Sequence, residues 1–575
     1  MELGLVEGDV LFVKRDRELR FRSPERMVVA RTLDEVVPLL ETLRLEVDRG
    51  KSVAGFLAYE AAPAFDPALA THPPGEFPLA WFGVYREGVE GQPTKTVDCD
   101  FKVGDWEALI TETDYRAAVE MIRELIAAGD TYQVNYTFPL EAEFEGSPLD
   151  WFRALLCEQR TEHAALVHAG RHILLSVSPE LFFHLEGETL TTRPMKGTSP
   201  RGRFPSEDRE RKRLLESSSK ERAENLMIVD LLRNDLGRVA RLGSVEARQL
   251  FEIERYETVW QMTSTIRAKT DAPVPQVIAS LFPSGSVTGA PKIRTMRVIR
   301  DLEPHPRGVY CGMIGWWLPG KRAKFNVAIR TVTLDSETGM ARYSVGGGIT
   351  WDSSTEQEYG ECLLKAEVLR RRTPDFELLE TFLYEGGFHL PDEHLARLAA
   401  SAEYFGIPLD PESVRVFLEE QARVFGAEPL RVRLLVDRGG KARLESAPLP
   451  PANPVRLGLA REPVDERDLF LFHKTTHRAV YENAGRQRPD CEDVLLWNRK
   501  GELTESAIAN LALEIEGKLL TPPVESGLLA GVFRGYLLAR GEIEERVLHR
   551  EDLPRAKRIL LFNSVRKWIE TEWID

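Results

Sequence analysis

The chain has 575 residues, and 76 Lys and Arg against 91 Asp and Glu leave a formal net charge of −15. A hydrophobic content of 43% with 29% charged residues is typical of a globular protein long enough for two large cores. The negative charge argues against a surface for nucleic acid or anionic membranes, which would need clustered Lys and Arg. Scattered cysteines, no secretory signal and no apolar stretch of about 18 residues predict a cytoplasmic location without a membrane span.

Apolar runs alternate with turns over residues 1–110, which predicts short strands and one helix near 33–48. Helical spacing of apolar residues predicts further helices at 114–129, 206–240, 273–282, 290–301 and 355–372. Strands are predicted at 308–318, 323–334 and 340–350. Thr373-Pro374-Asp375 ends the last helix, so we expect a domain boundary between 1–372 and 376–575.

The second part begins again with a predicted strand at 376–384 and an amphipathic helix at 391–405. No internal repeat is visible, and the two parts share no motif. The sequence therefore predicts a fusion of two unlike units.

Two of the predicted helices carry Glu-x-x-Glu, as Glu221/Glu224 and Glu358/Glu361. A spacing of three places both carboxylates of a pair on one helix face. Most such pairs lie on solvated surfaces. Four carboxylates from two helices, together with substrate oxygens and water, would however suit octahedral Mg²⁺.

Three Gly-rich stretches lie at 284–292, 308–315 and 346–348. Glycines let backbone N–H groups approach an anion, and Lys292 and Arg330 would add positive charge. None of the stretches matches the phosphate loop GxxxxGK[ST] or the dinucleotide motif GxGxxG. Each stretch taken alone is equally explained as a tight turn between strands.

An ordered series of motifs spans the first part. The series is 128–135, 178–180, 193–198, 223–227, 233–237, 289–292, 328–331, 346–348 and 358–361. It resembles the chorismate-utilising enzymes, and among them the aminodeoxychorismate synthases. The resemblance implies one α/β (α+β) domain of two large stacked antiparallel sheets with outer helices.

The resemblance also implies roles for particular residues. Lys196 would attack C2 of chorismate, where anthranilate synthases have Ala. Glu224 and Glu361 would bind Mg²⁺ with support from Glu221 and Glu358. The substrate carboxylates would be bound by Thr288, Gly289, Lys292, Arg330, Gly346, Gly347 and Gly348.

One departure from the pattern concerns proton transfer. Several relatives have a His where this chain has Gln261. Because an amide does not titrate, the acid or base must come from another residue.

A second series covers 379–381, 394–398, 474–476, 493–496, 501–510, 529–534 and 563–564. It resembles the fold-type IV pyridoxal-phosphate enzymes, most closely the aminodeoxychorismate lyases, and implies a two-subdomain α+β unit. Lys474 would bond covalently to pyridoxal phosphate and act as a base, and Glu505 would face its pyridine nitrogen. Thr381 would relay a proton to the leaving group. The phosphate would be bound by Arg397, Gly531, Val532 and Ser564.

This unit of about 200 residues is short for such an enzyme and lacks the usual opening strand. Either the first part covers the gap, or a homodimer partner does.

Both series imply one intermediate, 4-amino-4-deoxychorismate. The sequence thus predicts a bifunctional enzyme that makes it from chorismate and ammonia and then releases pyruvate to give 4-aminobenzoate, a folate precursor. No cysteine lies in a Gly-x-Cys-x-Gly setting, so ammonia is expected from a separate glutaminase subunit. Two alternatives keep a related first part: fusion to a transaminase, or anthranilate-synthase-like activity. An inactive regulatory module is disfavoured because the expected catalytic side chains are present.

Overall fold

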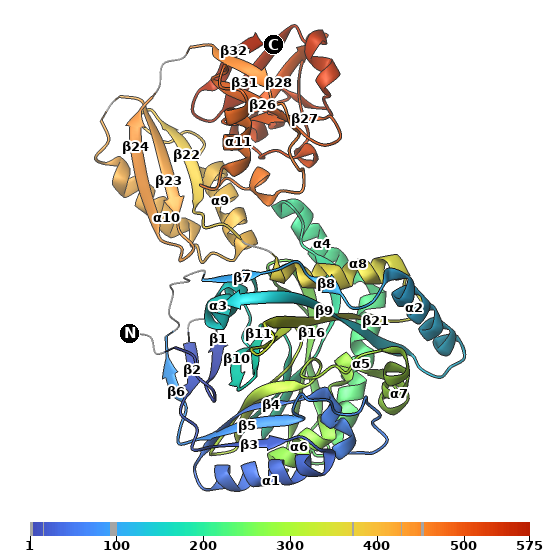
Figure 1. Cartoon of the computed structure of the whole chain (residues 1–575). Coiled ribbons are helices and arrows are strands. Elements are labelled where there is room, and N and C mark those ends of the chain that lie inside the picture. Colours follow the sequence, from blue (N-terminus) through green and yellow to red (C-terminus); the bar gives the residue numbers. More distant parts are fainter. Residues whose placement is uncertain (1–3, 15–16, 93–99, 371–372, 427, 450–452) are drawn as a thin grey trace. The chain divides into compact units, whose positions relative to one another are not determined.

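The computed structural model describes residues 4–14, 17–92, 100–370, 373–426, 428–449 and 453–575. It forms two compact units (Figure 1). The first comprises Met1–Pro200 and Lys212–Thr373, and the second comprises Arg201–Arg211 and Pro374–Asp575. Residue 372, where the first domain was predicted to end, lies outside the described residues.

The first unit contains two large antiparallel sheets. One has the order β17 (Gly289–Ala290), β9 (Gln133–Gly146), β21 (Met340–Ile349), β20 (Thr331–Asp335), β11 (His172–Ser176), β10 (Ala164–Ala169), β1 (Val10–Lys14), β2 (Arg17–Phe21) and β6 (Val89–Gly91), and β7 (Phe101–Val103) and β8 (Glu107–Ala108) pair with β9. The other has the order β14 (Met195–Pro200), β16 (Val259–Lys269), β13 (Thr189–Arg193), β12 (Leu181–Glu186), β19 (Arg322–Val327), β18 (Met313–Leu318), β4 (Ser52–Leu57), β5 (Ala80–Tyr85) and β3 (Arg26–Ala30), and β15 (Glu246–Arg255) pairs with β16.

Buried side chains join the two sheets. Val10 and Phe21 of the first sheet share a core with Phe56 and Trp81 of the second. Burial of such large apolar groups on facing sheets is the main force that holds a sandwich together. The predicted pair of stacked antiparallel sheets is confirmed.

Helices cover the outer faces of both sheets. On the second sheet lie α1 (Leu33–Asp48), α5 (Ser219–Gly237) and α6 (Val274–Leu281). On the first sheet lie α2 (Glu112–Ala127), α3 (Pro148–Glu158), α7 (Lys292–Leu302) and α8 (Thr355–Ala366). Figure 1 shows α1 and α6 beside β3. No described helix is both long and apolar enough to cross a bilayer.

Two of the predicted elements are each divided in two, and the strand predicted at 308–318 begins only at Met313. The helix predicted at 206–240 is two helices, α4 (Pro205–Ser217) and α5. Ser218 between them has φ −66° and ψ 112°, and its hydroxyl accepts a hydrogen bond from the backbone N–H of Glu221 at 3.3 Å. Such a side chain caps a new helix instead of continuing the old one, and the cap places Glu221 in the first turn of α5.

The strand predicted at 323–334 is also two strands, β19 and β20, which belong to different sheets. The chain leaves one sheet for the other at Arg330, whose φ of 48° lies in the left-handed region. A break of this kind interrupts strand pairing. It also places Arg330 in the crossover between the two sheets, directly before β20.

The second unit has two sheets and two sets of helices. A three-stranded sheet, β22 (Leu378–Tyr384), β23 (Leu430–Val436) and β24 (Ala442–Pro448), packs with α9 (Pro391–Phe405) and α10 (Pro411–Ala422). The larger sheet has the order β27 (Leu503–Ser506), β26 (Asp493–Trp497), β25 (Val455–Leu459), β32 (Lys567–Ile574), β31 (Arg558–Asn563), β28 (Asn510–Ile515), β29 (Lys518–Thr521) and β30 (Glu544–Glu545). The helices α11 (Ala479–Gln487) and α12 (Val532–Ala539) accompany it. The predicted α+β character of this unit is confirmed.

Candidate active sites

A cavity of about 180 Å³ in the first unit is lined from both sheets and from α5 and α8. Lys196 reaches it from β14, and Arg330 from the turn before β20. The structure brings most of the predicted residues of this unit to one place. The others that line the cavity are Glu221, Glu224, Glu358, Glu361, Gly346, Gly347 and Gly348.

Three of the four glutamates have cationic or hydroxyl partners. The Lys196 ammonium lies 3.4 Å from Glu224 Oε2, and the Lys365 ammonium lies 2.9 Å from Glu361 Oε1. The Ser353 hydroxyl donates to Glu358 at 2.7 Å. Burial, and then the charge of Glu224, raises the pKa of Glu221. The carboxylates are thus close enough to affect one another.

These carboxylates fit Mg²⁺ by the chemistry of the donor set. No group of three or more His, Cys, Asp and Glu side chains within the described ranges forms a ready-made metal cage. Mg²⁺, however, is usually bound by one or two carboxylates together with substrate oxygens and water. Glu224 and Glu361 supply such a pair, one from each helix.

Gly348 brings Lys196 close to Gln133. A Cβ atom on Gly348 would lie 2.2 Å from Lys196 Nζ and 2.4 Å from Gln133 Nε2, so any larger residue here would displace the ends of both side chains. Gln133 is fully buried, and neither its amide oxygen nor its nitrogen has a hydrogen-bond partner in the described part of the chain. An unpaired buried amide is costly, and a polar ligand beside Lys196 would satisfy it.

Glu180 is a second ionisable group beside the cavity. It lies just before β12, is 3% exposed, and accepts a hydrogen bond from the Ser286 hydroxyl at 2.5 Å. Burial raises its pKa to about 8. Glu180 is therefore mostly protonated at neutral pH and can donate a proton.

Gln261 instead holds the backbone next to Lys196. Its amide nitrogen donates to the Gly197 carbonyl at 2.7 Å, and its amide oxygen accepts from the Thr198 hydroxyl at 3.1 Å. Asn225 of α5 donates to the Lys196 carbonyl at 3.0 Å. These contacts fix the strand that carries the lysine.

The structure does not bring three of the predicted substrate ligands into the cavity lining. Thr288 is fully buried, and its hydroxyl donates to the Ser284 carbonyl at 3.1 Å. Gly289 pairs with Val134. Lys292 forms a 2.6 Å ion pair with Asp235. This stretch supports the strand that carries Gln133.

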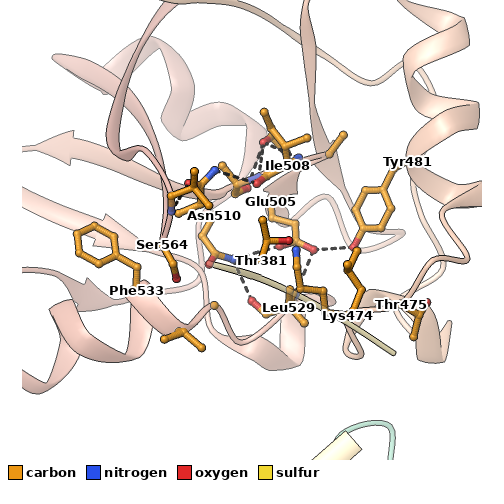
Figure 2. A pocket seen from close by; sticks show the side chains of 18 of the residues that line it. Thr381, Lys474, Thr475, Tyr481, Glu505, Ile508, Asn510, Leu529, Phe533 and Ser564 are labelled. Atoms are coloured by element: carbon orange, nitrogen blue, oxygen red, sulfur yellow. Dashed lines mark hydrogen bonds between the residues drawn. The ribbon is translucent and has the colours of Figure 1, made fainter. Parts of the chain in front are cut away.

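A cavity of about 330 Å³ in the second unit is lined by every residue predicted for the cofactor site (Figure 2). These residues are Thr381, Arg397, Lys474, Glu505, Gly531, Val532 and Ser564.

Lys474 is held by the edge of β22, where its carbonyl accepts a hydrogen bond from the Leu379 N–H at 2.9 Å. Burial, and then the nearby charge of Arg397, lowers the pKa of Lys474 to about 8. A lysine with this pKa is partly neutral near neutral pH, as a nucleophilic amine must be.

Glu505 of β27 accepts three hydrogen bonds. The donors are the Tyr481 hydroxyl at 2.8 Å, the Leu529 N–H at 3.1 Å and the Asn510 amide at 3.1 Å. Figure 2 shows these contacts. Burial raises the pKa of Glu505 to about 7. A cationic group in the cavity would favour its ionised form.

Another part of the lining of this cavity has the features of an anion site. Arg397 of α9 forms an ion pair with Glu380 at 2.6 Å and donates to the Ala530 carbonyl at 3.2 Å. Gly531 caps the N-terminus of α12, where backbone N–H groups and the helix dipole favour a phosphate. His394 Nε2 is buried without a partner within the described ranges. The residues therefore fit pyridoxal phosphate.

Several residues in or beside the cavities were not given a role from the sequence. Glu180 lines the first cavity and Gln133 lies next to Gly348; both lie inside recognised motifs, but only their burial indicates a chemical function. Arg431 and Arg433 also line the second cavity. Alternation along β23 places them on one face, and Arg433 is the strand partner of Thr381. A strand with alternating Arg is the signal that could have identified them.

Comparisons with known proteins agree with this geometry. Residues 5–371 match the family model described as chorismate binding enzyme, and residues 376–571 match that described as amino-transferase class IV. Aminodeoxychorismate synthase component 1 of Salmonella typhimurium is 40% identical over 262 residues, which is 45% of this chain and 57% of that protein. The chain thus spans little more than half of that relative.

Two further matches concern anthranilate synthases. Anthranilate synthase component 1 1 of Haloarcula marismortui is 34% identical over 363 residues, covering 60% of this chain and 72% of that protein. The structure of anthranilate synthase component I from Streptococcus pneumoniae TIGR4 has a TM-score of 0.56 at 24% identity, covering 64% of this chain and 95% of that one. It shares the fold of the first unit. The chain belongs to the chorismate binding enzyme family, and its second unit carries an amino-transferase class IV domain.

Proposed function

We propose that the chain is a bifunctional enzyme that makes 4-aminobenzoate. The first unit converts chorismate and ammonia to 4-amino-4-deoxychorismate, and the second releases pyruvate from that intermediate. The observation that carries the proposal is the presence of Lys196 in the chorismate-type cavity and of Lys474 and the buried Glu505 in the second. The same observation favours this reaction over anthranilate formation, for which the sequence resemblance expects Ala at position 196.

The side chains of the first cavity fit the synthase reaction. Lys196 forms a bond to C2 of chorismate while the hydroxyl at C4 leaves with the proton of Glu180. Ammonia then bonds to C4, Lys196 leaves C2, and the net by-product is water. Mg²⁺ held by Glu224 and Glu361, with Glu221 and Glu358 beside them, would supply Lewis-acid assistance to departure of the hydroxyl.

Glu180 takes the proton-donor role for which Gln261 is unsuitable. Its pKa of about 8 keeps it protonated at neutral pH, and the Ser286 hydroxyl orients it. Gln133 lies beside Lys196 but outside the cavity lining, and its unpaired amide would hydrogen-bond to ammonia that reaches this point. Arg330 and the backbone at 346–348 would bind the substrate carboxylates.

In the second cavity, pyridoxal phosphate would be held by Lys474, Glu505, Arg397, Gly531, Val532 and Ser564, and would supply an electron sink. Lys474 takes the proton from C4 of the bound substrate, and Thr381 gives a proton to the departing enolpyruvyl oxygen. Arg431 and Arg433, beside Thr381, suit the two carboxylates of the substrate. Their charge is also the feature that favours a lyase over a transaminase for branched-chain amino acids.

A separate glutaminase subunit would supply the ammonia. The Salmonella relative is named as a component 1, which implies a second component. We further propose a cytoplasmic location and a homodimer formed through the second unit.

Replacement of Lys196 separates its nucleophilic role from its ion pair. Lys196→Ala should lower the formation of 4-amino-4-deoxychorismate by roughly 10³-fold or more. Lys196→Arg keeps a cation near Glu224, but the guanidinium is not a nucleophile. This variant should therefore lose as much synthase activity as Lys196→Ala. Both variants should still release pyruvate from supplied intermediate. Substantial synthase activity in Lys196→Arg would argue against a covalent role.

Glu361→Gln should raise the Mg²⁺ concentration for half-maximal synthase activity by about tenfold, because a hard anionic ligand is lost. Glu356→Gln on the same helix is the matched control, since Glu356 is exposed and lies outside the cavity lining. A Mg²⁺ titration of both variants measures the effect. Identical curves would place the metal elsewhere.

Lys474→Ala should remove the visible absorbance of the lysine-bound cofactor and stop the chain at 4-amino-4-deoxychorismate. Chorismate consumption should continue, because Lys474 takes no part in the first reaction. Lys518→Ala, a change at an exposed lysine of the same unit, should leave both steps intact. If 4-aminobenzoate still formed at the wild-type rate in Lys474→Ala, the second unit would not be the lyase.

A further inference from the structure

A short segment from within the first domain's sequence belongs to the second unit. Arg201–Arg211 groups with Pro374–Asp575, although the chorismate binding family model runs through it. The segment follows β14 and includes the first turns of α4. The second unit is therefore built from two separate stretches of chain.

A buried ion pair folds this segment on itself. Arg201 Nε and Nη2 donate to the two carboxylate oxygens of Asp208, each at 2.7 Å, and the two side chains are 5% and 7% exposed. The Gly202 N–H donates to the same carboxylate at 2.9 Å. Paired bonds of this kind fix the orientation of the guanidinium plane.

The guanidinium of Arg201 covers Tyr404 at the end of α9. It lies 4.3 Å from the ring centre and donates to the Tyr404 carbonyl at 3.0 Å. The Tyr404 hydroxyl donates in turn to the Gly202 carbonyl at 2.7 Å. Cation–π contact and two hydrogen bonds thus hold this ring against the segment.

The ring of Tyr404 packs against His473, the residue before Lys474. Their ring centres are 4.3 Å apart, and Phe405 lies 4.8 Å from the same imidazole. The Ser401 hydroxyl is 3.0 Å from His473 Nδ1. His473 is 1% exposed, and burial lowers its pKa to about 3, so it is a neutral anchor.

The same segment also contacts the residue two positions before Lys474. Phe204 stacks on Phe472 with ring centres 5.3 Å apart, and the Arg203 guanidinium lies 5.4 Å from the Phe472 ring. Arg203 donates further to the carbonyls of Glu466 and Glu525, both at 3.3 Å. Both residues that precede Lys474 are thus supported from Arg201–Arg211, one directly and one through Tyr404.

We propose that Arg201–Arg211 is a working part of the cofactor site, in which Arg201 and Tyr404 act through His473 as positioning residues for Lys474. The segment adds eleven residues to a second unit that is short for an enzyme of the type it resembles. The proposal rests on the proposed function only in taking Lys474 as the cofactor lysine.

The test compares Arg201→Met and Tyr404→Phe with a matched control in the full chain. Tyr404→Phe removes the hydroxyl that donates to the Gly202 carbonyl and keeps the ring on His473. Arg488→Met is the control, because Arg488 forms a comparable ion pair with Asp490 in the same unit without touching Tyr404 or His473. Arg201→Lys tests rescue, since lysine keeps the charge but not the planar fork.

Two measurements report on Lys474. The first is the pH dependence of chemical labelling of Lys474 in the cofactor-free protein, read by mass spectrometry. We expect the midpoint, about 8 in the wild type, to rise by about one pH unit in Arg201→Met, because a loosened lysine is less desolvated. The second is the dissociation constant of pyridoxal phosphate, which should rise about tenfold.

The results distinguish the role of Arg201–Arg211 from the proposed function of the chain. Tyr404→Phe should shift in the same direction by less, Arg201→Lys should recover part of the loss, and Arg488→Met should match the wild type. Equal labelling midpoints in the wild type, Arg201→Met and Tyr404→Phe would overturn this inference. A wild-type chain that bound no pyridoxal phosphate would instead count against the proposed function, because the labelling readout needs no cofactor.

Discussion

The lack of a side chain at Gly348 is the feature on which the placement of Lys196 and Gln133 in the first unit depends. Gly348 and Gln133 belong to one sheet, and Lys196 belongs to the other. A single methyl group at position 348 would overlap both polar side chains. Because this position lacks a side chain, an amine and an unpaired amide lie within reach of the same small ligand. The helices α5 and α8 contribute the four glutamate carboxylates to the same cavity.

The cavity of the second unit is surrounded by side chains of opposite charge. Glu505 is buried and Lys474 and Arg397 are partly buried around this cavity, where unpaired charges are destabilising. Glu380 between Arg397 and His394 offsets part of that penalty, and these two partners bring its pKa to about 2 although burial acts in the opposite direction. A cofactor with a phosphate and a ring nitrogen would match the remaining charges, and such binding would stabilise the unit.

Much of this arrangement could be predicted from the sequence. The spacing in Glu-x-x-Glu placed two carboxylates on one helix face, and the ordered motifs indicated both stacked sheets and the two lysines. Helical periodicity missed the break at Ser218 because the apolar pattern continues through it, whereas the hydroxyl cap is a local hydrogen bond. Candidate residues inside a recognised motif could be predicted, because the motif fixes their positions relative to one another in the sequence.

The features that escaped prediction depend on contacts between distant residues. Lys292 has the charge of a substrate ligand, but it pairs with Asp235, which lies 57 positions earlier. Glu180 and Gln133 gain their chemical character from burial, which a single sequence does not report. Arg201–Arg211 is contiguous with the first domain in sequence, and only its packing on Tyr404 and Phe472 assigns it to the second unit.

The most direct test of the central claim is an incubation of the cofactor-free chain with chorismate, Mg²⁺ and ammonium, with and without added pyridoxal phosphate. Aminobenzoate isomers and pyruvate are measured together. The account predicts that 4-amino-4-deoxychorismate accumulates without pyruvate in the absence of the cofactor, and that 4-aminobenzoate and pyruvate form in equal amounts in its presence. Release of 2-aminobenzoate, or of pyruvate from the cofactor-free chain, would contradict it.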